Sequence, residues 1–210
     1  MEVKKFYDNF APVYAVIDIF LKPQKKVLIN YVNSLPPGKL LEVGIGTGSH
    51  MPLYQNHIIT GIDISPKSIE VASKRPKNTK LSLKIMNGEK MDFADGLFDY
   101  VVVSHVIAVT ENPDKMVCEC FRVLKRNGLL FILNHETPEN EIRHVDKFFN
   151  RFSRYLKLTP YFKINSINAI SSFKIVEEMY MGPFNYFKLV ILKKSTENMA
   201  DHSSLSESGS

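Results

Sequence analysis

An acidic residue and three alternating glycines form the most informative chemical pattern in this 210-residue sequence. Glu42 precedes Gly44, Gly46 and Gly48, and the residues just before it are apolar. Glycine permits backbone angles and a close approach of a ligand that a Cβ atom would block. Glu42 could accept hydrogen bonds from backbone or amino groups at the edge of such a ligand. The pattern predicts a strand that runs into a ligand-binding turn.

Two polar positions follow this turn, each at the end of an apolar run. Asp63 lies about 20 residues downstream, where a carboxylate can accept hydrogen bonds from both hydroxyls of a ribose. Asn87 is followed by Gly88, whose amide is suited to contact an adenine edge. Glu42 or Asp63, taken alone, fits a helix cap or a solvated strand end equally well. Together with the glycines, these residues predict a ligand that contains adenosine.

A nicotinamide dinucleotide site also carries an acid after its second strand. Its turn normally has the spacing G-x-G-x-x-G. Residues 44–48 instead have the spacing G-x-G-x-G, with an acid two residues before the first glycine. This spacing disfavours a pyrophosphate-binding turn and favours a single adenosyl group.

The elements that position these residues alternate between strand-length apolar runs and helical patterns. Strands are predicted at 40–44, 58–62, 81–86, 100–106, 129–133, 173–181 and 186–192, the last two as an antiparallel pair. Helices are predicted at 65–74 and 112–125, with Ser65 and Asn112 as N-caps. This order predicts an α/β, Rossmann-like fold with a mostly parallel, seven-stranded sheet and helices on both faces.

Two amphipathic helices are predicted before the sheet. Residues 3–20 place apolar side chains at intervals of three or four, the period of one helical face, with a break near Pro12. Pro23 is expected to separate this helix from a second one at 24–33. At the other end, residues 195–210 are rich in Ser, Glu and Asn and are predicted to be disordered.

The composition predicts one globular domain with a negatively charged partner. A net charge of +5 suits anionic lipid, nucleic acid or an acidic small molecule, and nucleic acid is disfavoured because no recognition module is visible. Residues 1–5 do not begin a secretory signal and no apolar run has the length of a membrane span, so a cytoplasmic protein is expected. Cys118 and Cys120 would point in different directions on a helix, so no metal site is expected.

Taken together, the motifs resemble those of the class I S-adenosylmethionine-dependent methyltransferases. The resemblance lies within residues 38–135 and rests on E-V-G-I-G-T-G, G-I-D-I-S, N-G-E, F-D-Y-V-V-V-S and F-R-V-L-K-R-N-G-L-L. It implies S-adenosyl-L-methionine as the methyl donor and S-adenosyl-L-homocysteine as the product. It also implies N-terminal lid helices at 1–36 and a methyltransferase domain at 37–194, followed by the tail.

The same resemblance implies roles for individual residues. The three glycines would border the methionine part and the ribose, Asp63 would hold the ribose hydroxyls, and Asn87 would face adenine. Asn87 stands where the family usually has Asp, which keeps hydrogen bonding but removes the charge. The expected donor-binding residues are Glu42, Gly44, Gly46, Gly48, Asp63, Ile64, Asn87, Gly88, Glu89 and Ser104.

A narrower resemblance, to the bacterial soluble-type phosphatidylethanolamine N-methyltransferases, comes from the flanks. It rests on F-Y-D-N-F-A-P-V-Y, S-H-V-I-A-V-T-E-N-P-D, L-N-H-E-T-P-E-N and G-P-F-N-Y-F-K-L, although Ala15 stands where that group often has an acid. It implies an amine phospholipid as the acceptor. The alternatives are a soluble amine or hydroxyl acceptor, and a non-catalytic membrane-surface protein with this fold.

The chemistry asks little of the protein, because a sulfonium is an activated methyl donor. The amine has to be neutral, in line with the methyl group and shielded from water, and no metal is needed. Tyr7, His105 and His135, the last beside Glu136, are the catalytic candidates because they follow strand ends or lie on a helix that could fold over them. Each also fits a structural role.

A basic and aromatic stretch gives a route to a membrane. Residues 143–157 combine Arg and Lys with Phe and Tyr. With the N-terminal helix, they could bind an anionic membrane surface without spanning it, although a solvated helix face is the alternative. We therefore expect a cytoplasmic enzyme that associates peripherally with the inner membrane.

Overall fold

The computed structural model describes residues 11–75, 80–135, 163–182 and 185–195. Within them lie the glycine turn, both candidate histidines and all seven strands of one sheet. The predictions for Tyr7, Glu136, the stretch 143–157 and residues 196–210 fall outside the described residues.

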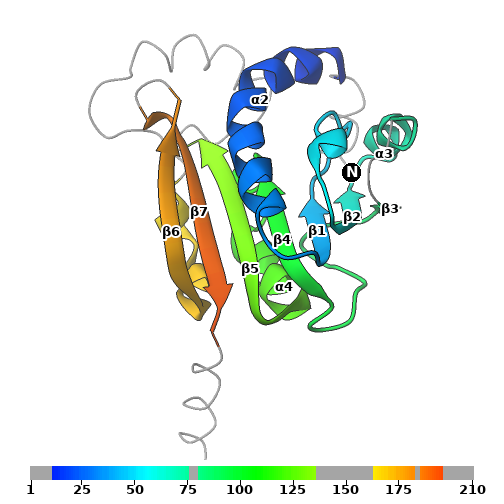
Figure 1. The fold of residues 1–210 in the computed structure, drawn as a ribbon. Helices are drawn as coiled ribbons and strands as arrows, with labels where there is room; N and C mark the ends of the chain where they lie inside the picture. Colours follow the sequence, from blue (N-terminus) through cyan, green and yellow to red (C-terminus); the bar gives the residue numbers. More distant parts are fainter. Residues whose placement is uncertain (1–10, 76–79, 136–162, 183–184, 196–210) are drawn as a thin grey trace, which may run out of the picture.

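A seven-stranded sheet forms the centre of the protein, in the order β3-β2-β1-β4-β5-β7-β6 (Figure 1). The strands are β1 (Lys39–Val43), β2 (Ile58–Asp63), β3 (Leu81–Ile85), β4 (Phe98–Ser104), β5 (Leu124–His135), β6 (Phe173–Met181) and β7 (Phe187–Lys194). Strands β1 to β5 are parallel, and β7 is antiparallel to both β5 and β6. The predicted sheet, including its antiparallel pair, is confirmed.

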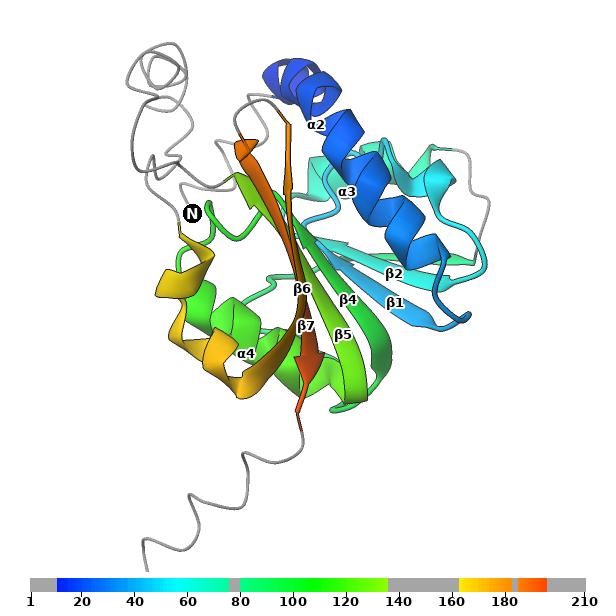
Figure 2. The ribbon, with the colours of Figure 1, turned by 60° about the vertical axis from the view of Figure 1, so that its left-hand side comes forward.

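Helices cover both faces of the sheet, which explains why the central strands are apolar throughout. Figure 2 shows α2 (Ala11–Asn33) and α3 (Pro66–Ser73) on one face and α4 (Pro113–Val123) on the other. The short 3₁₀ helices η2 (Ile164–Ser166) and η3 (Asn168–Ser172) accompany α4, and a third, η1 (Met51–Leu53), follows the glycine turn. Side chains of β1, β4 and β5 alternate between two buried clusters, one on each side.

Helix α2 corrects the prediction of two helices separated at Pro23, because it runs through that residue without a break. An internal proline removes one backbone hydrogen bond and usually bends a helix. Figure 1 shows α2 changing direction before it follows the sheet. Beyond the proline, Leu28, Ile29 and Val32 are buried against the sheet. This burial keeps the second part of the helix in place despite the proline.

The two N-cap predictions are confirmed. The Ser65 hydroxyl accepts a hydrogen bond from the amide of Ser68 at 3.2 Å, and the Asn112 side chain accepts one from the amide of Lys115 at 2.9 Å. Helix α4 ends at Val123, slightly before the predicted end, because Leu124 already pairs with Phe98 in the sheet.

Candidate active site

The glycine turn leaves β1 at the carboxyl edge of the parallel strands, where open α/β sheets bind their ligands. The amides of Gly44 and Ile45 both donate to the carbonyl of Ile62 on β2, at 2.8 and 3.0 Å. Gly44, Gly46 and Gly48 all have positive φ angles, of 71°, 57° and 65°. The turn therefore needs glycine for its backbone conformation, as the sequence predicted.

The surroundings of these glycines differ. A Cβ atom on Gly44 would lie 2.1 Å from Val106 Cγ2, so the turn is packed against the segment that follows β4. A Cβ atom on Gly46 would meet nothing within 4 Å. The backbone at Gly46 thus faces open space, which suits the close approach of a ligand.

Asp63 lies beside this open space at the end of β2. Its carboxylate accepts hydrogen bonds from the amide of Gly46 at 2.8 Å and from the amide of Ser65 at 2.9 Å. Burial raises the pKa of Asp63, and the two backbone hydrogen bonds oppose that rise. Two carboxylate oxygens offer more acceptor sites than two amides use, so the group can still accept ribose hydroxyls. Ile64, the next residue, is 40% exposed and adds an apolar side chain at the same edge.

The predicted adenine-facing residues form a turn after β3. The Asn87 side chain accepts a hydrogen bond from the amide of Glu89 at 2.9 Å. The Glu89 carboxylate in turn accepts hydrogen bonds from the Thr110 hydroxyl and from the amide of Asn112 at 3.0 Å. Gly88 is tightly enclosed, since a Cβ atom there would lie 2.6 Å from Val43 Cγ1. The structure therefore brings this turn against the end of β1.

Glu42 lies beneath the glycine turn, where it is only 1% exposed. Its carboxylate bonds to Nε2 of His50, and Tyr54 is buried beside this pair. Burial, followed by the negative charge of Glu42, raises the pKa of Tyr54 well above its usual range. Within the described part of the chain, Oε2 of Glu42 and Nδ1 of His50 have no hydrogen-bond partner.

Ser104 ends β4 on the same face of the sheet as Glu42, because Glu42 pairs with Val102 in the register. Its buried hydroxyl also has no hydrogen-bond partner among the described residues. Buried polar atoms are normally paired, and a bound ligand or water can supply the missing partner. These atoms and the open space at Gly46 fit a polar ligand of adenosyl type. Whether Glu42 and Ser104 contact that ligand stays a prediction.

Each of the two candidate histidines packs against one of two adjacent aromatic rings, Tyr186 and Phe187, at the start of β7. The ring of His105 contacts that of Phe187 edge to face, with 5.6 Å between the ring centroids. The ring of His135 stacks on that of Tyr186, with 5.8 Å between the centroids. Tyr186 and Phe187 contact each other at 5.2 Å. His105 has a φ of 57°, which is uncommon for a residue with a side chain. We refer to these four residues as the aromatic cluster.

Several polar residues at this edge were not predicted as site residues. His50 pairs with Glu42 and Tyr54 is buried beside them, while Asn134 and Lys188 are buried where β5 meets β7. Lys188 forms an ion pair with Glu178 at 3.2 Å. The signal was present, because a buried polar residue inside an apolar strand usually has a specific partner. The partner, however, is far away in the sequence.

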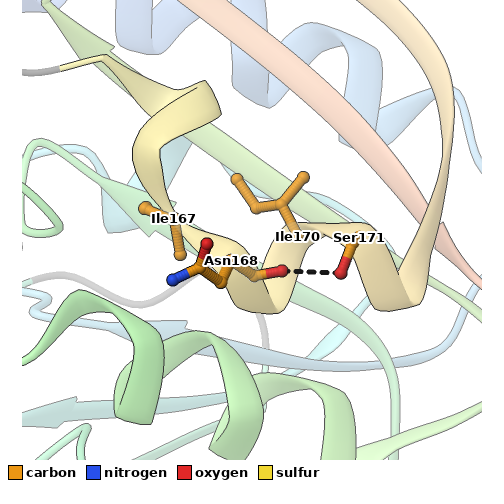
Figure 3. Close-up of a pocket in the computed structure, with 4 residues that line it drawn as sticks. All are labelled: Ile167, Asn168, Ile170 and Ser171. Carbon is orange, nitrogen blue, oxygen red and sulfur yellow. Dashed lines mark hydrogen bonds between the residues drawn. The ribbon is translucent and has the colours of Figure 1, made fainter.

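A separate cavity of about 330 Å³ lies in the η2 and η3 segment, on the α4 side of the sheet. Figure 3 shows its lining by Ile167, Asn168, Ile170 and Ser171, with the Ser171 hydroxyl donating to the carbonyl of Asn168 at 2.7 Å. Its lining contains no charged side chain. We do not assign it to the site at the carboxyl edge.

Metal-binding clusters and membrane-spanning helices were sought within the described ranges. No group of His, Cys, Asp and Glu residues there could hold a metal ion. In the same ranges, no helix is both long and apolar enough to cross a bilayer.

Comparisons with known proteins place the chain among methyltransferases. A sequence profile described as a methyltransferase domain matches residues 41–132. The phosphatidylethanolamine N-methyltransferase of Cereibacter sphaeroides is 32% identical over 156 residues, which cover 71% of this chain and 77% of that protein. The demethylmenaquinone methyltransferase of Bacteroides fragilis is 31% identical over 151 residues, which cover 66% of this chain and 62% of that protein.

The fold also matches a solved structure. A crystal structure from Thermotoga maritima, described as a SAM-dependent methyltransferase and possible histamine N-methyltransferase, has a TM-score of 0.69 to this protein. The match covers 91% of this chain and 100% of that one, at 19% sequence identity. At this identity the likeness concerns the fold alone.

Proposed function

This chain belongs to the class I S-adenosylmethionine-dependent methyltransferases, and we propose that it methylates the amine of phosphatidylethanolamine or a related amine lipid at a membrane surface. The methyl donor is S-adenosyl-L-methionine, and the product is S-adenosyl-L-homocysteine. The 32% identical phosphatidylethanolamine N-methyltransferase supports the choice of acceptor.

The donor, when bound, supplies a methyl group on a positively charged sulfur. The open backbone at Gly46 would border it, Asp63 would accept the ribose hydroxyls, and Asn87 with Gly88 would face adenine. These groups are held by backbone hydrogen bonds before any ligand arrives. Such preorganisation lowers the entropy cost of binding.

The aromatic cluster is the main observation that supports an amine as the methyl acceptor. The neutral nitrogen gains a positive charge as it takes up the methyl group, a quaternary ammonium product keeps that charge, and aromatic faces within about 6 Å attract a cation. Tyr186 and Phe187 offer such faces at the start of β7, beside His105 and His135 at the ends of β4 and β5. In the reaction, the carbon–sulfur bond breaks, a carbon–nitrogen bond forms, and one proton leaves the nitrogen.

His135 is the residue we propose to accept that proton, because a neutral imidazole titrates near physiological pH. Asn134, its neighbour, is 1% exposed, and its Oδ1 has no hydrogen-bond partner in the part of the chain that the structure describes. Consecutive residues of a strand point to opposite faces of the sheet, so this oxygen lies on the other face from His135 and is not assigned a part in the reaction. Tyr7, from the N-terminal segment, remains a candidate for accepting the proton.

The membrane part of the proposal rests on the composition of two segments outside the described residues. The stretch 143–157 and the N-terminal segment combine basic and aromatic side chains. Such segments bind anionic lipid surfaces while their rings enter the interface. This supports peripheral association with the cytoplasmic face of the inner membrane.

The test is methyl transfer from labelled donor to vesicles that contain phosphatidylethanolamine and an anionic lipid. Vesicles of phosphatidylcholine and the same anionic lipid, which offer no methylatable amine, are the control. We expect labelled lipid with the first vesicles only. Donor binding measured by calorimetry without labelled lipid product would overturn the proposed acceptor while leaving the methyltransferase assignment intact.

A quinone-type ring carbon is the second candidate acceptor, because the demethylmenaquinone methyltransferase is 31% identical, nearly as similar as the first relative. Mass spectrometry of lipid extracts from cells that express the protein distinguishes the two, since the added mass would appear on a quinone instead of on a phospholipid headgroup. A water-soluble amine acceptor would instead show turnover that vesicles do not change.

A further inference from the structure

We propose that Glu119 and Arg122 are positioning residues that fix the adenine-facing turn, and thereby set the affinity for the donor from outside the binding site. The inference rests on the proposed placement of adenine at Asn87 and Gly88. Neither Glu119 nor Arg122 belongs to the predicted donor-binding set.

The segment between β3 and β4, residues 86–97, contains no helix and no strand. It nevertheless carries the adenine-facing turn at its start. A segment without its own ladder of hydrogen bonds needs other groups to hold it, because its backbone polar groups must be satisfied elsewhere. Helix α4 supplies these groups.

Arg122 makes most of the contacts through its guanidinium. Its Nη1 donates to the carbonyl of Phe93 at 2.6 Å and to the Asp95 carboxylate at 2.7 Å. Its Nη2 donates to the carbonyl of Met91 at 2.7 Å. The carbonyl of Arg122 itself accepts from the amide of Gly96 at 3.0 Å. One residue therefore holds four positions of the segment.

Glu119 orients the guanidinium and adds a contact of its own. Its carboxylate accepts from Nε and Nη2 of Arg122 at 2.7 and 2.9 Å, in a two-pronged pair. It also accepts from the amide of Met91 at 2.6 Å. The paired guanidinium lowers the pKa of Glu119, so the carboxylate stays ionised. Met91 is thus held at both its amide and its carbonyl.

We refer to Glu119 and Arg122 as the clamp. Met116, a third residue of α4, connects the clamp to the adenine-facing turn. Met116, Glu119 and Arg122 follow one another at intervals of three, so Glu119 is a neighbour of both on the helix surface. A Cβ atom on Gly88 would lie 3.0 Å from Cε of Met116. The same helix therefore contacts both the adenine-facing turn and the segment that follows it.

The clamp differs from an ordinary surface ion pair. The side chains of Arg122 and Glu119 are 31% and 20% exposed, whereas the Lys74–Glu70 pair on α3 is 71% and 64% exposed. Exposed pairs contribute little because water screens them. A planar guanidinium also reaches several carbonyls at once, which the single ammonium of lysine cannot do.

The test compares Arg122→Ala, Arg122→Lys and Glu119→Gln with Lys125→Ala. The last substitution removes the nearby Lys125–Asp99 ion pair at 2.7 Å and leaves the clamp intact. Calorimetry with S-adenosyl-L-homocysteine measures affinity, and hydrogen exchange without ligand measures protection of residues 87–95. We expect an affinity loss of about tenfold and faster exchange in Arg122→Ala, smaller changes in the other two clamp variants, and neither change in Lys125→Ala.

Kinetics separate positioning from general destabilisation. Positioning predicts a higher KM for the donor with an unchanged kcat at saturating donor, and partial rescue by lysine. If Arg122→Ala does not fold, Arg122→Lys and Glu119→Gln decide the question. Unchanged exchange, or an affinity loss no larger than that of Lys125→Ala, would overturn the inference. Wild-type protein that does not bind S-adenosyl-L-homocysteine would overturn the donor site itself, and the inference with it.

Discussion

The proposed donor side and the proposed acceptor side, both at the carboxyl edge of the sheet, are built in different ways. On the donor side, backbone amides and short polar side chains meet around the glycine turn, as in the bonds from Gly46 and Ser65 to Asp63. On the acceptor side, side-chain rings from separate strands meet, with Tyr186 and Phe187 holding both histidines. Backbone geometry defines the first region, and side-chain packing defines the second.

This difference predicts separate consequences for binding and for turnover. A change on the donor side should alter the affinity for S-adenosyl-L-homocysteine. A change on the acceptor side should alter kcat or the KM for the amine and leave that affinity unchanged. The substitutions below test the separation.

The largest effect is expected from Gly46→Ala. Its Cβ atom would enter open space where the donor approaches, so we expect a loss of donor affinity of about 100-fold by calorimetry. Asn127→Ala is the control for backbone strain, because Asn127 has a similar φ of 62°, compared with 57° at Gly46, and lies exposed near the start of β5, away from the carboxyl edge of the sheet. Neither variant should lose more than about 1 kcal/mol of stability from backbone strain. Equal donor affinity in the two variants would contradict the position of the donor.

Asp63→Asn should weaken donor binding by about tenfold to thirtyfold, because a charged hydrogen-bond acceptor is worth more than a neutral one. Calorimetry with S-adenosyl-L-homocysteine measures this change. The ion-pair variant Glu70→Gln, on the exposed surface of α3, serves as the control. An Asp63→Asn variant that binds as tightly as wild type would remove Asp63 from the ribose site.

His135→Phe should lower kcat by about tenfold while donor affinity stays unchanged. The substitution keeps a ring against Tyr186 but removes the nitrogen that accepts a proton. This expected loss in kcat is smaller than the usual contribution of general acid–base catalysis, because the amine can also deprotonate before it binds. Initial rates over a range of pH measure the effect. A variant with normal kcat but weakened donor binding would break the division between the two sides.

The smallest expected effect is a pH dependence of donor affinity that comes from Asp63. Burial raises the pKa of this carboxyl above 3.8, and ribose hydroxyls bind best to the ionised form. Donor affinity should therefore fall as the pH is lowered through the raised pKa of Asp63 and the carboxyl becomes protonated. The free energy of unfolding depends on pH in the opposite direction. Because the pKa of Asp63 is raised in the folded protein, this group contributes stability below pH 3.8, and the contribution is lost as the pH rises through the pKa of the folded state. Asp63→Asn should abolish the pH dependence seen by calorimetry.

Much of the fold follows from local patterns that the sequence contains. The strands, the N-caps at Ser65 and Asn112, and the glycine turn can all be located from residue types within short segments. Strand alternation, capping and positive φ angles are properties of short segments, so they are visible without tertiary structure. The position of Asp63 also follows, because adjacent parallel strands end at the same edge of a sheet.

The remaining features depend on partners far away in the chain. The sequence predicts a break at Pro23, yet burial of Leu28 and Val32 against the sheet holds one helix across it. Nothing near Asn87 identifies Arg122 as the residue that holds the following segment. His105 and His135 belong to one cluster only because β7 inserts beside β5 and brings Phe187 against His105 and Tyr186 against His135.

The sequence by itself therefore determined the donor, because the glycine turn and the polar residues after neighbouring strands carry motifs of the S-adenosylmethionine-dependent methyltransferases within short segments. Only the tertiary structure decided which side chains support the proposed donor site and which rings form the proposed acceptor side. These contacts join residues that are distant in the chain, and their geometry exists only after the sheet has assembled.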